Sequence, residues 1–192
     1  MSGENMFGPF VGFKSIGVVG LGMHEFSDEP LIETRVGDAL AECGETLAAA
    51  ESCSGGLIAS LVTDVPGSSD YFDRSYVTYS DEAKQQVLGV TREALDEASA
   101  VSARVGRQMA KGARDTADAT WGLSTTGVAG PERDRADHPV GTVFVGVAQA
   151  APWGSGESRT TVERYQFDGS RTEIKERVVR QALSDLLDRI QE

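Results

Sequence analysis

Segments with apolar residues at helical spacing alternate along this chain with shorter apolar segments that fit buried strands. Between residues 31 and 43 apolar side chains recur every three or four positions, whereas the run 46–50 is short and largely apolar. The same criteria predict further helices over 57–62, over 81–88 with Ser80 as N-cap, and over 172–190. Two more helices are predicted to begin after the N-cap residues Thr91 and Ser102. They predict further strands over 75–79, 121–125, 140–148 and 160–167.

This order of elements predicts a single domain of the α/β class. Helices placed between strands favour parallel pairing and cover both faces of the sheet. The last two strands follow each other closely and add an antiparallel hairpin. We therefore expect a three-layer α/β/α architecture with a mixed, mostly parallel sheet. The sequence contains neither an internal repeat nor a linker between domains.

The first 28 residues differ from the rest of the chain. They are rich in Gly and Phe, have no helical period, and lack the basic start and cleavage site of a signal peptide. We predict a poorly ordered extension over 1–28 and a folded domain over 29–192. Met23 is an alternative start.

The charge balance narrows the range of partners. The chain has 30 acidic and 18 basic residues, a net charge of −12, and only four of the basic residues are lysines. An acidic surface repels phosphate backbones, so nucleic-acid binding is not expected. Many carboxylates and few lysines fit a protein kept soluble in high salt, or an ordinary acidic cytosolic protein.

Several other classes are disfavoured. No apolar run reaches the roughly 18 residues of a membrane helix. Two cysteines give no disulfide framework, which indicates a reducing, cytoplasmic location. Two histidines and the absence of CxxC or HExxH spacing give no metal site, and no cofactor is expected.

Three polar turns are predicted to follow strands, at residues 51–56, 66–70 and 126–131. Ligands of α/β sheets usually bind at the carboxyl ends of strands. The first turn runs into a helix, whose N-terminal N–H groups attract anions such as phosphate. Its candidate ligand-binding residues are Ser52, Ser54, Gly55 and Gly56; the alternative is a tight turn with a serine cap.

A second group of residues, Ser69, Tyr79 and Lys84, offers nucleophilic chemistry without a metal or histidine. A lysine in a dry pocket loses its proton more easily and can act as a base for a serine, and a tyrosine can relay the proton. Lys84 also opposes the dipole at the start of its predicted helix, which favours a functional role over a solvated surface position. Cys53 is a competing nucleophile, although a buried free cysteine is usually inert packing.

Six segments together resemble the C-terminal domain of the CinA family. They are AESCSGG (50–56), TDVPGSS (63–69), VTYSDEAK (77–84), TGVAGP (126–131), PVGTV (139–143) and FDGSR (167–171), in order and with the expected spacing. The resemblance covers about residues 31–190.

The resemblance implies a nicotinamide mononucleotide (NMN) deamidase, which hydrolyses the carboxamide to nicotinate mononucleotide and ammonia in pyridine nucleotide salvage. It places the catalytic serine, tyrosine and lysine at Ser69, Tyr79 and Lys84, and substrate-binding positions at Thr126, Gly127 and Arg171. It also implies self-association into a homo-oligomer. Two alternatives remain open: a non-catalytic nucleotide-binding or regulatory family member, and an amidohydrolase with another substrate.

Three positions depart from the pattern of the family. Asp81 replaces an asparagine and favours a protonated Lys84. The loop 132–137 is highly charged where the family has further glycines, so affinity or specificity is expected to differ. Ser54 replaces a threonine and keeps the hydroxyl. Larger family members carry an N-terminal nucleotide-pyrophosphatase domain, and its activity is not expected of the present sequence.

Overall fold

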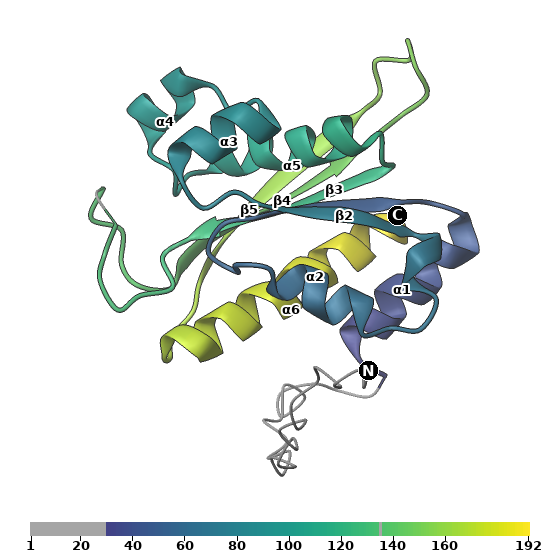
Figure 1. Ribbon diagram of the computed structural model, residues 1–192, viewed down its shortest axis with the longest axis horizontal. Helices are drawn as coiled ribbons and strands as arrows, with labels where there is room; N and C mark the ends of the chain where they lie inside the picture. Colours follow the sequence, from purple (N-terminus) through teal and green to yellow (C-terminus); the bar gives the residue numbers. More distant parts are fainter. Residues whose placement is uncertain (1–29, 135) are drawn as a thin grey trace, which may run out of the picture.

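The computed structural model describes residues 30–134 and 136–192, which form one α/β domain (Figure 1). The predicted extension over 1–28 lies outside the described residues. The elements in chain order are α1 (Ile32–Cys43), β1 (Leu47–Glu51), α2 (Leu57–Thr63), the 3₁₀ helix η1 (Ser68–Asp70), β2 (Phe72–Val77), α3 (Asp81–Leu88), α4 (Arg92–Ala98), α5 (Ala103–Ala117), β3 (Trp121–Gly127), β4 (Thr142–Gln149), β5 (Arg159–Gln166) and α6 (Arg171–Ile190).

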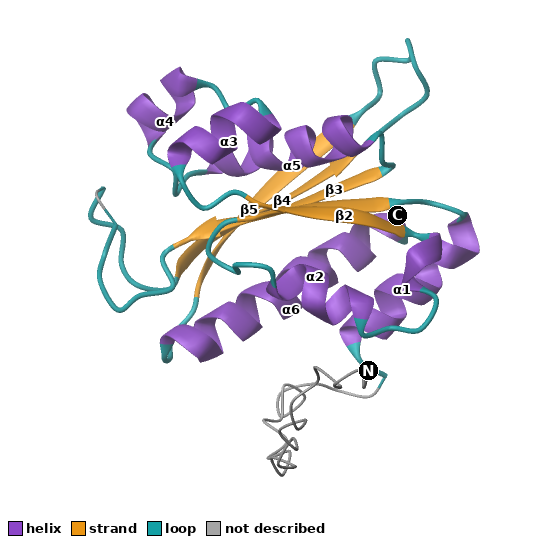
Figure 2. Cartoon of the chain, in the orientation of Figure 1, coloured by secondary structure: helices purple, strands orange, loops and turns teal. Residues whose placement is uncertain are grey.

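The sheet has the strand order β2-β1-β3-β4-β5. Strand β1 pairs in parallel with both β2 and β3, and β4 pairs antiparallel with β3 and β5. Figure 2 shows helices α3, α4 and α5 on one face and α1, α2 and α6 on the other. The prediction of a three-layer domain with a mixed sheet is confirmed, and its parallel part carries the segments 51–56 and 77–84.

Each face of the sheet has its own apolar core. One cluster joins the sheet to α1, α2 and α6, and the other joins it to α3, α4 and α5. All residues of β1 are buried, and its three successive alanines let helices approach from both sides. A side chain at Gly122 of β3 would lie 2.1 Å from the Ala110 carbonyl oxygen, so glycine is required where α5 crosses that strand.

The helix caps agree with the sequence. The hydroxyls of Ser80, Thr91 and Ser102 each accept a hydrogen bond from the main chain three residues later. Helix α6 additionally begins with a capping box formed by Ser170 and Glu173. Well-made caps fix the starts of α3 and α6, and both starts border the cavity described below.

Strand β2 differs most from the prediction. It spans Phe72–Val77 rather than 75–79, so the polar turn 66–70 precedes a strand instead of following one. β2 is an edge strand whose Asp73 and Arg74 are exposed, so its first half carries no alternating apolar signal. The position of β2 along the chain is important because it determines at which end of this strand Ser69 lies.

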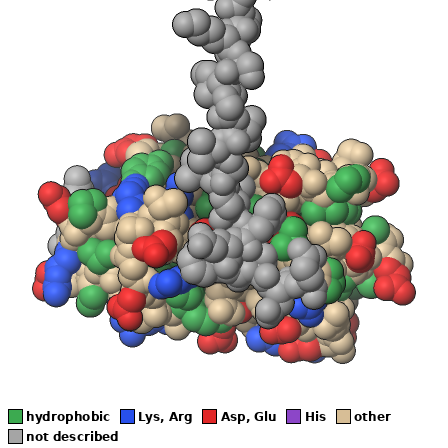
Figure 3. Space-filling model, turned by 90° about the horizontal axis from the view of Figure 1, so that it is seen from below, with side chains coloured by type: hydrophobic (Ala, Val, Ile, Leu, Met, Phe, Trp, Pro, Cys, Tyr) green, Lys and Arg blue, Asp and Glu red, His purple; other side chains and the backbone are tan. Residues whose placement is uncertain are grey.

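The surface seen in Figure 3 carries acidic side chains interspersed with basic ones. Such mixing leaves no broad basic field for a phosphate backbone on that face. None of the helices in the described part of the chain is both long and apolar enough to cross a bilayer.

Candidate active site

A cavity of about 180 Å³ opens at the carboxyl ends of the parallel strands. Its walls come from the turn after β1, the segment after β2, the end of β3 and the first residue of α6. The lining residues are Ser52, Cys53, Tyr79, Lys84, Ala100, Val101, Thr126, Gly127, Ala129 and Arg171. The cavity therefore lies where ligands of parallel α/β sheets usually bind.

Lys84 is almost completely buried in the wall of this cavity, with 1% of its surface exposed. Its Nζ donates hydrogen bonds to the carbonyl oxygens of Thr78 and Tyr79, both at 3.0 Å. Burial lowers the pKa of the amine because a dry site disfavours the ammonium ion, and the Asp81 carboxylate opposes that shift. A neutral amine held in place at a cavity is a competent general base.

Ser52 lies directly after β1 and lines the same cavity as Lys84. It is 9% exposed, and its main-chain N–H donates to the Thr125 carbonyl oxygen at 3.0 Å. This bond continues the pairing of β1 with β3 by one residue and fixes the serine at the mouth of the cavity. Ser52 thus brings a hydroxyl to the cavity that the buried Lys84 also lines.

Glu51, the last residue of β1, organises the turn that carries Ser52. Its fully buried carboxylate accepts hydrogen bonds from the hydroxyls of Ser54 and Ser75, both at 2.8 Å. It also accepts the main-chain N–H groups of Gly56, Ile58 and Ala59 at 2.8–3.1 Å. The sequence analysis did not single out Glu51, because a lone acidic residue after a strand carries no signal of these five partners.

The Glu51 contacts occupy N–H groups of the predicted phosphate-binding turn 51–56. The N-terminal N–H groups of α2 already bind an internal carboxylate, so they are not available to an external anion. The Ser54 hydroxyl also contacts Thr125 Oγ1 at 2.7 Å. Gly55 and Gly56 adopt φ values of 62° and 95°, which the turn requires. Ser54, Gly55 and Gly56 therefore shape the turn and do not line the cavity.

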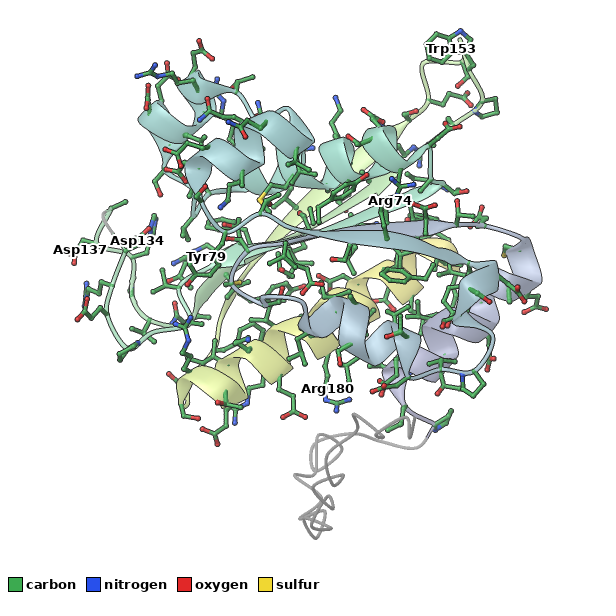
Figure 4. The ribbon with its side chains drawn as sticks, in the orientation of Figure 1. Arg74, Tyr79, Asp134, Asp137, Trp153 and Arg180 are labelled. Atoms are coloured by element: carbon green, nitrogen blue, oxygen red, sulfur yellow. The ribbon has the colours of Figure 1, made fainter. Side chains whose placement is uncertain are left out.

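Ser69 lies at the other end of β2 from Tyr79 and Lys84. It belongs to η1, and the following Tyr71 carbonyl accepts the N–H of Leu47 at the start of β1. The strand that separates Ser69 from the cavity rises about 3.3 Å per residue. Figure 4 shows this direction, with Arg74 in the first half of β2 and Tyr79 at the cavity end. Within one chain, the structure does not bring Ser69 together with Lys84.

Tyr79 and Arg171 meet at the opening of the cavity. Tyr79 is 65% exposed, and its hydroxyl contacts Arg171 Nη2 at 3.3 Å. Arg171 also donates to the carbonyl oxygen of Gly130. The exposed phenol of Tyr79 thus contacts Arg171, and Tyr79 lines the same cavity as Lys84.

Thr126 and Gly127 form the wall at the end of β3. The Thr126 hydroxyl donates to the Ala100 carbonyl oxygen at 2.7 Å. A side chain at Gly127 would lie 2.6 Å from the Thr142 carbonyl oxygen. Both residues line the cavity as expected, although they lie in a strand instead of the predicted turn.

Cys53 lines the cavity but is a poor nucleophile. Burial raises the pKa of its thiol to about 12, with a small opposing effect from its own main-chain N–H and the nearby lysines. A thiol with such a pKa carries almost no thiolate at neutral pH, and the thiolate is the reactive form.

A second, wider pocket of about 320 Å³ adjoins the cavity. The two share Tyr79, Gly127, Ala129 and Arg171. The outer pocket is completed by Val128 and by residues 130–134 of the following loop. Figure 4 shows Asp134 on this loop, facing the same end of the sheet as Tyr79.

Potential metal ligands do not gather in this region. Among residues 30–134 and 136–192, no three His, Cys, Asp or Glu side chains come close enough to hold one ion.

The structure is thus a small α/β domain with a mixed sheet, which brings a serine and a buried lysine to one cavity at the carboxyl ends of its parallel strands. The sequence profile of the CinA C-terminal domain matches residues 30–190, and the chain belongs to this family.

Comparisons with individual proteins agree with this assignment. A "CinA-like protein" of Geobacter metallireducens is 47% identical over 148 residues, which are 77% of this chain and 34% of that protein. A "putative competence-damage inducible protein" of Symbiobacterium thermophilum is 43% identical over 160 residues, 82% of this chain and 38% of that protein. The chain thus spans about a third of the length of these curated relatives.

Solved structures share the fold over nearly their whole length. Competence damage-inducible protein A of Klebsiella pneumoniae has a TM-score of 0.78 at 32% identity, covering 84% of this chain and 96% of its own. A CinA superfamily protein of Enterobacter cloacae has a TM-score of 0.77 at 27% identity, covering 97% and 99%.

Proposed function

We propose that this domain is an amidohydrolase that removes the carboxamide nitrogen of nicotinamide mononucleotide, with Ser52 as nucleophile and Lys84 as general base. The observation that carries the proposal is the burial of Lys84 beside Ser52 in one cavity. The substrate is inferred from the family resemblance. Ser52 is proposed as the nucleophile because it lines the same cavity as Lys84.

The reaction proceeds through an acyl-enzyme. Neutral Lys84 takes the proton of the Ser52 hydroxyl while Oγ attacks the carboxamide carbon. The resulting ammonium returns this proton to the leaving nitrogen, and ammonia departs as the C–N bond breaks. Lys84 then takes a proton from water as this water attacks the Ser52 ester. It returns that proton to Ser52 Oγ as the ester C–O bond breaks, which restores the free serine and the neutral amine. The acid product loses its own proton to solvent and leaves as nicotinate mononucleotide.

The other cavity residues position the substrate. Arg171 presents a guanidinium at the entrance, where it can bind an anionic group of a nucleotide through paired hydrogen bonds. Tyr79 holds that guanidinium through its hydroxyl. Glu51 is a positioning residue, because it fixes the turn from which Ser52 reaches the cavity.

The test is release of ammonia from NMN by the purified protein, at low and at molar potassium chloride and with and without EDTA. The matched variant is Lys84→Met, which keeps the length of the buried side chain and removes the amine. The proposal predicts release that survives EDTA and is lost in Lys84→Met. Binding of NMN without any release would favour a non-catalytic nucleotide-binding protein, and release from a different amide would change the substrate.

A further inference from the structure

We infer that the outer pocket binds the phosphate group of the nucleotide, and that Arg133 is a specificity-determining residue that holds it together with Arg171. The inference rests on the proposed function, because that function places the carboxamide in the inner cavity. The resemblance to the family does not supply Arg133, since it lies in the charged loop by which this chain departs from the family pattern.

The volumes of the inner cavity and the outer pocket indicate which part of the substrate each of them holds. Pockets that enclose a whole drug-sized ligand measure about 300–1,000 Å³. The inner cavity of about 180 Å³ suits the pyridine ring and its carboxamide next to Ser52. The outer pocket of about 320 Å³ shares a wall with it, so the ribose and phosphate of the same molecule extend there.

The outer pocket contains two guanidinium groups. Arg171 lies on the shared wall, and Arg133 lies on the loop opposite. Arginine binds phosphate oxygens through two parallel hydrogen bonds, and two arginines match the double charge of a phosphate monoester. Both sources of positive charge are therefore at the end of the substrate that is remote from the reacting carbon.

The acidic residues of the pocket do not compete strongly for these cations. The Asp134 carboxylate accepts the main-chain N–H and approaches the Nδ1 of His138, both at 2.8 Å, and it accepts the N–H of Ala136 at 3.2 Å. These bonds satisfy Asp134 locally and brace the loop next to Arg133. Glu132 is exposed to solvent, which weakens its charge without removing it, so it opposes an anion in this pocket.

Arg133 can exchange its ion-pair partner Asp137 for a phosphate group. Its side chain is 57% exposed, and its Nη1 lies 3.2 Å from the carboxylate of the 84% exposed Asp137 and donates to the Asp137 carbonyl oxygen at 3.1 Å. Such exposed ion pairs contribute little to stability, so phosphate oxygens can replace the carboxylate. The N-terminus of α2, which also lies at this end of the molecule, already holds Glu51.

The experiment compares NMN with nicotinamide riboside, which lacks the phosphate, in Arg133→Gln and in a matched control. Arg92→Gln is the control, because Arg92 forms an exposed ion pair of the same i,i+4 spacing with Asp96. We expect Arg133→Gln to lower kcat/KM for NMN about tenfold and to leave the riboside value unchanged. Arg92→Gln changes neither, and Glu132→Gln raises the value for NMN.

Two results would overturn the inference: an equal loss on both substrates, and no loss on NMN. Calorimetric binding of both compounds separates this failure from failure of the proposed function. If wild type releases no ammonia, an affinity for NMN that exceeds that for the riboside and depends on Arg133 still supports the phosphate site. Equal affinities, or binding of neither compound, exclude it.

Discussion

The amine of Lys84 donates a hydrogen bond to the main-chain carbonyl oxygen of Tyr79, while the phenol of the same tyrosine contacts Arg171. Tyr79 therefore binds the Lys84 amine through its main-chain carbonyl oxygen and contacts Arg171 at the cavity entrance through its side chain. This arrangement differs from a proton relay, in which the phenol itself would have to face the amine.

Replacing Tyr79 by Phe tests this separation. Because the backbone carbonyl stays and only the contact with Arg171 is lost, we expect a higher KM for NMN and a kcat within about tenfold of wild type. Steady-state kinetics at saturating NMN measures both constants. A kcat loss as large as that of Lys84→Met would mean that the phenol takes part in proton transfer.

The Asp81 carboxylate affects the pH range in which Lys84 can act as a base. Its carboxylate stabilises the ammonium form and so raises the pKa of Lys84, against the larger lowering by burial. Asp81→Asn removes this effect, the pKa falls further, and the neutral amine is present at lower pH. We expect the acidic limb of the kcat/KM profile to move to lower pH at low salt.

Glu82→Gln is the control for the Asp81 experiment. It removes the charge of an exposed residue from the same helical turn, where solvent screens that charge. We expect its acidic limb to coincide with that of wild type. A profile for Asp81→Asn that stayed in place would show that the limb does not report Lys84.

Glu51→Gln tests the positioning of Ser52. An amide NH₂ cannot accept the hydrogen bonds that one carboxylate oxygen now receives, so we expect a loss of about 3 kcal/mol in the free energy of unfolding. The folded fraction should also show a lower kcat, because the turn after β1 carries the nucleophile. Urea denaturation and kinetics at low temperature measure the two effects.

Glu93→Gln offers the comparison for Glu51. Glu93 is an exposed acid in the first turn of α4, where removal of its charge weakens only a solvated helix terminus. Its stability and kcat should stay close to wild type. Unchanged stability in Glu51→Gln would contradict the capping role.

The two cysteines should differ in reactivity. Cys43 is exposed, whereas Cys53 is buried and burial raises its pKa to about 12. Iodoacetamide at pH 8 should modify Cys43 alone in the native protein and both thiols after denaturation, as counted by mass spectrometry. Full modification of Cys43 should leave ammonia release unchanged; rapid modification of Cys53 with loss of activity would favour a cysteine nucleophile.

Much of the site was predictable because its signals are local. The cap at Ser80, the unfavourable position of Lys84 near a helix start and the polar turn after β1 each depend on a few neighbouring residues. These signals place Ser52 and Lys84 in one region once the strands pair in parallel.

Two features of this region depend on contacts between segments that are far apart in the sequence. The role of Glu51 depends on Ser75, which is brought close only by the pairing of β1 with β2. The position of Ser69 depends on where β2 begins, and this exposed edge strand has a weak apolar pattern. Neither the contact between Glu51 and Ser75 nor the position of Ser69 follows from residue spacing alone.

The most direct test of the account compares Ser52→Ala with Ser69→Ala in ammonia release from NMN. Ser52→Ala should reduce kcat by more than about 1,000-fold with its fold intact, since it removes the nucleophile. Ser69→Ala changes an exposed hydroxyl at the far end of β2 and should keep kcat within about threefold of wild type. Loss of activity in Ser69→Ala together with an active Ser52→Ala would contradict the assignment of the nucleophile to Ser52.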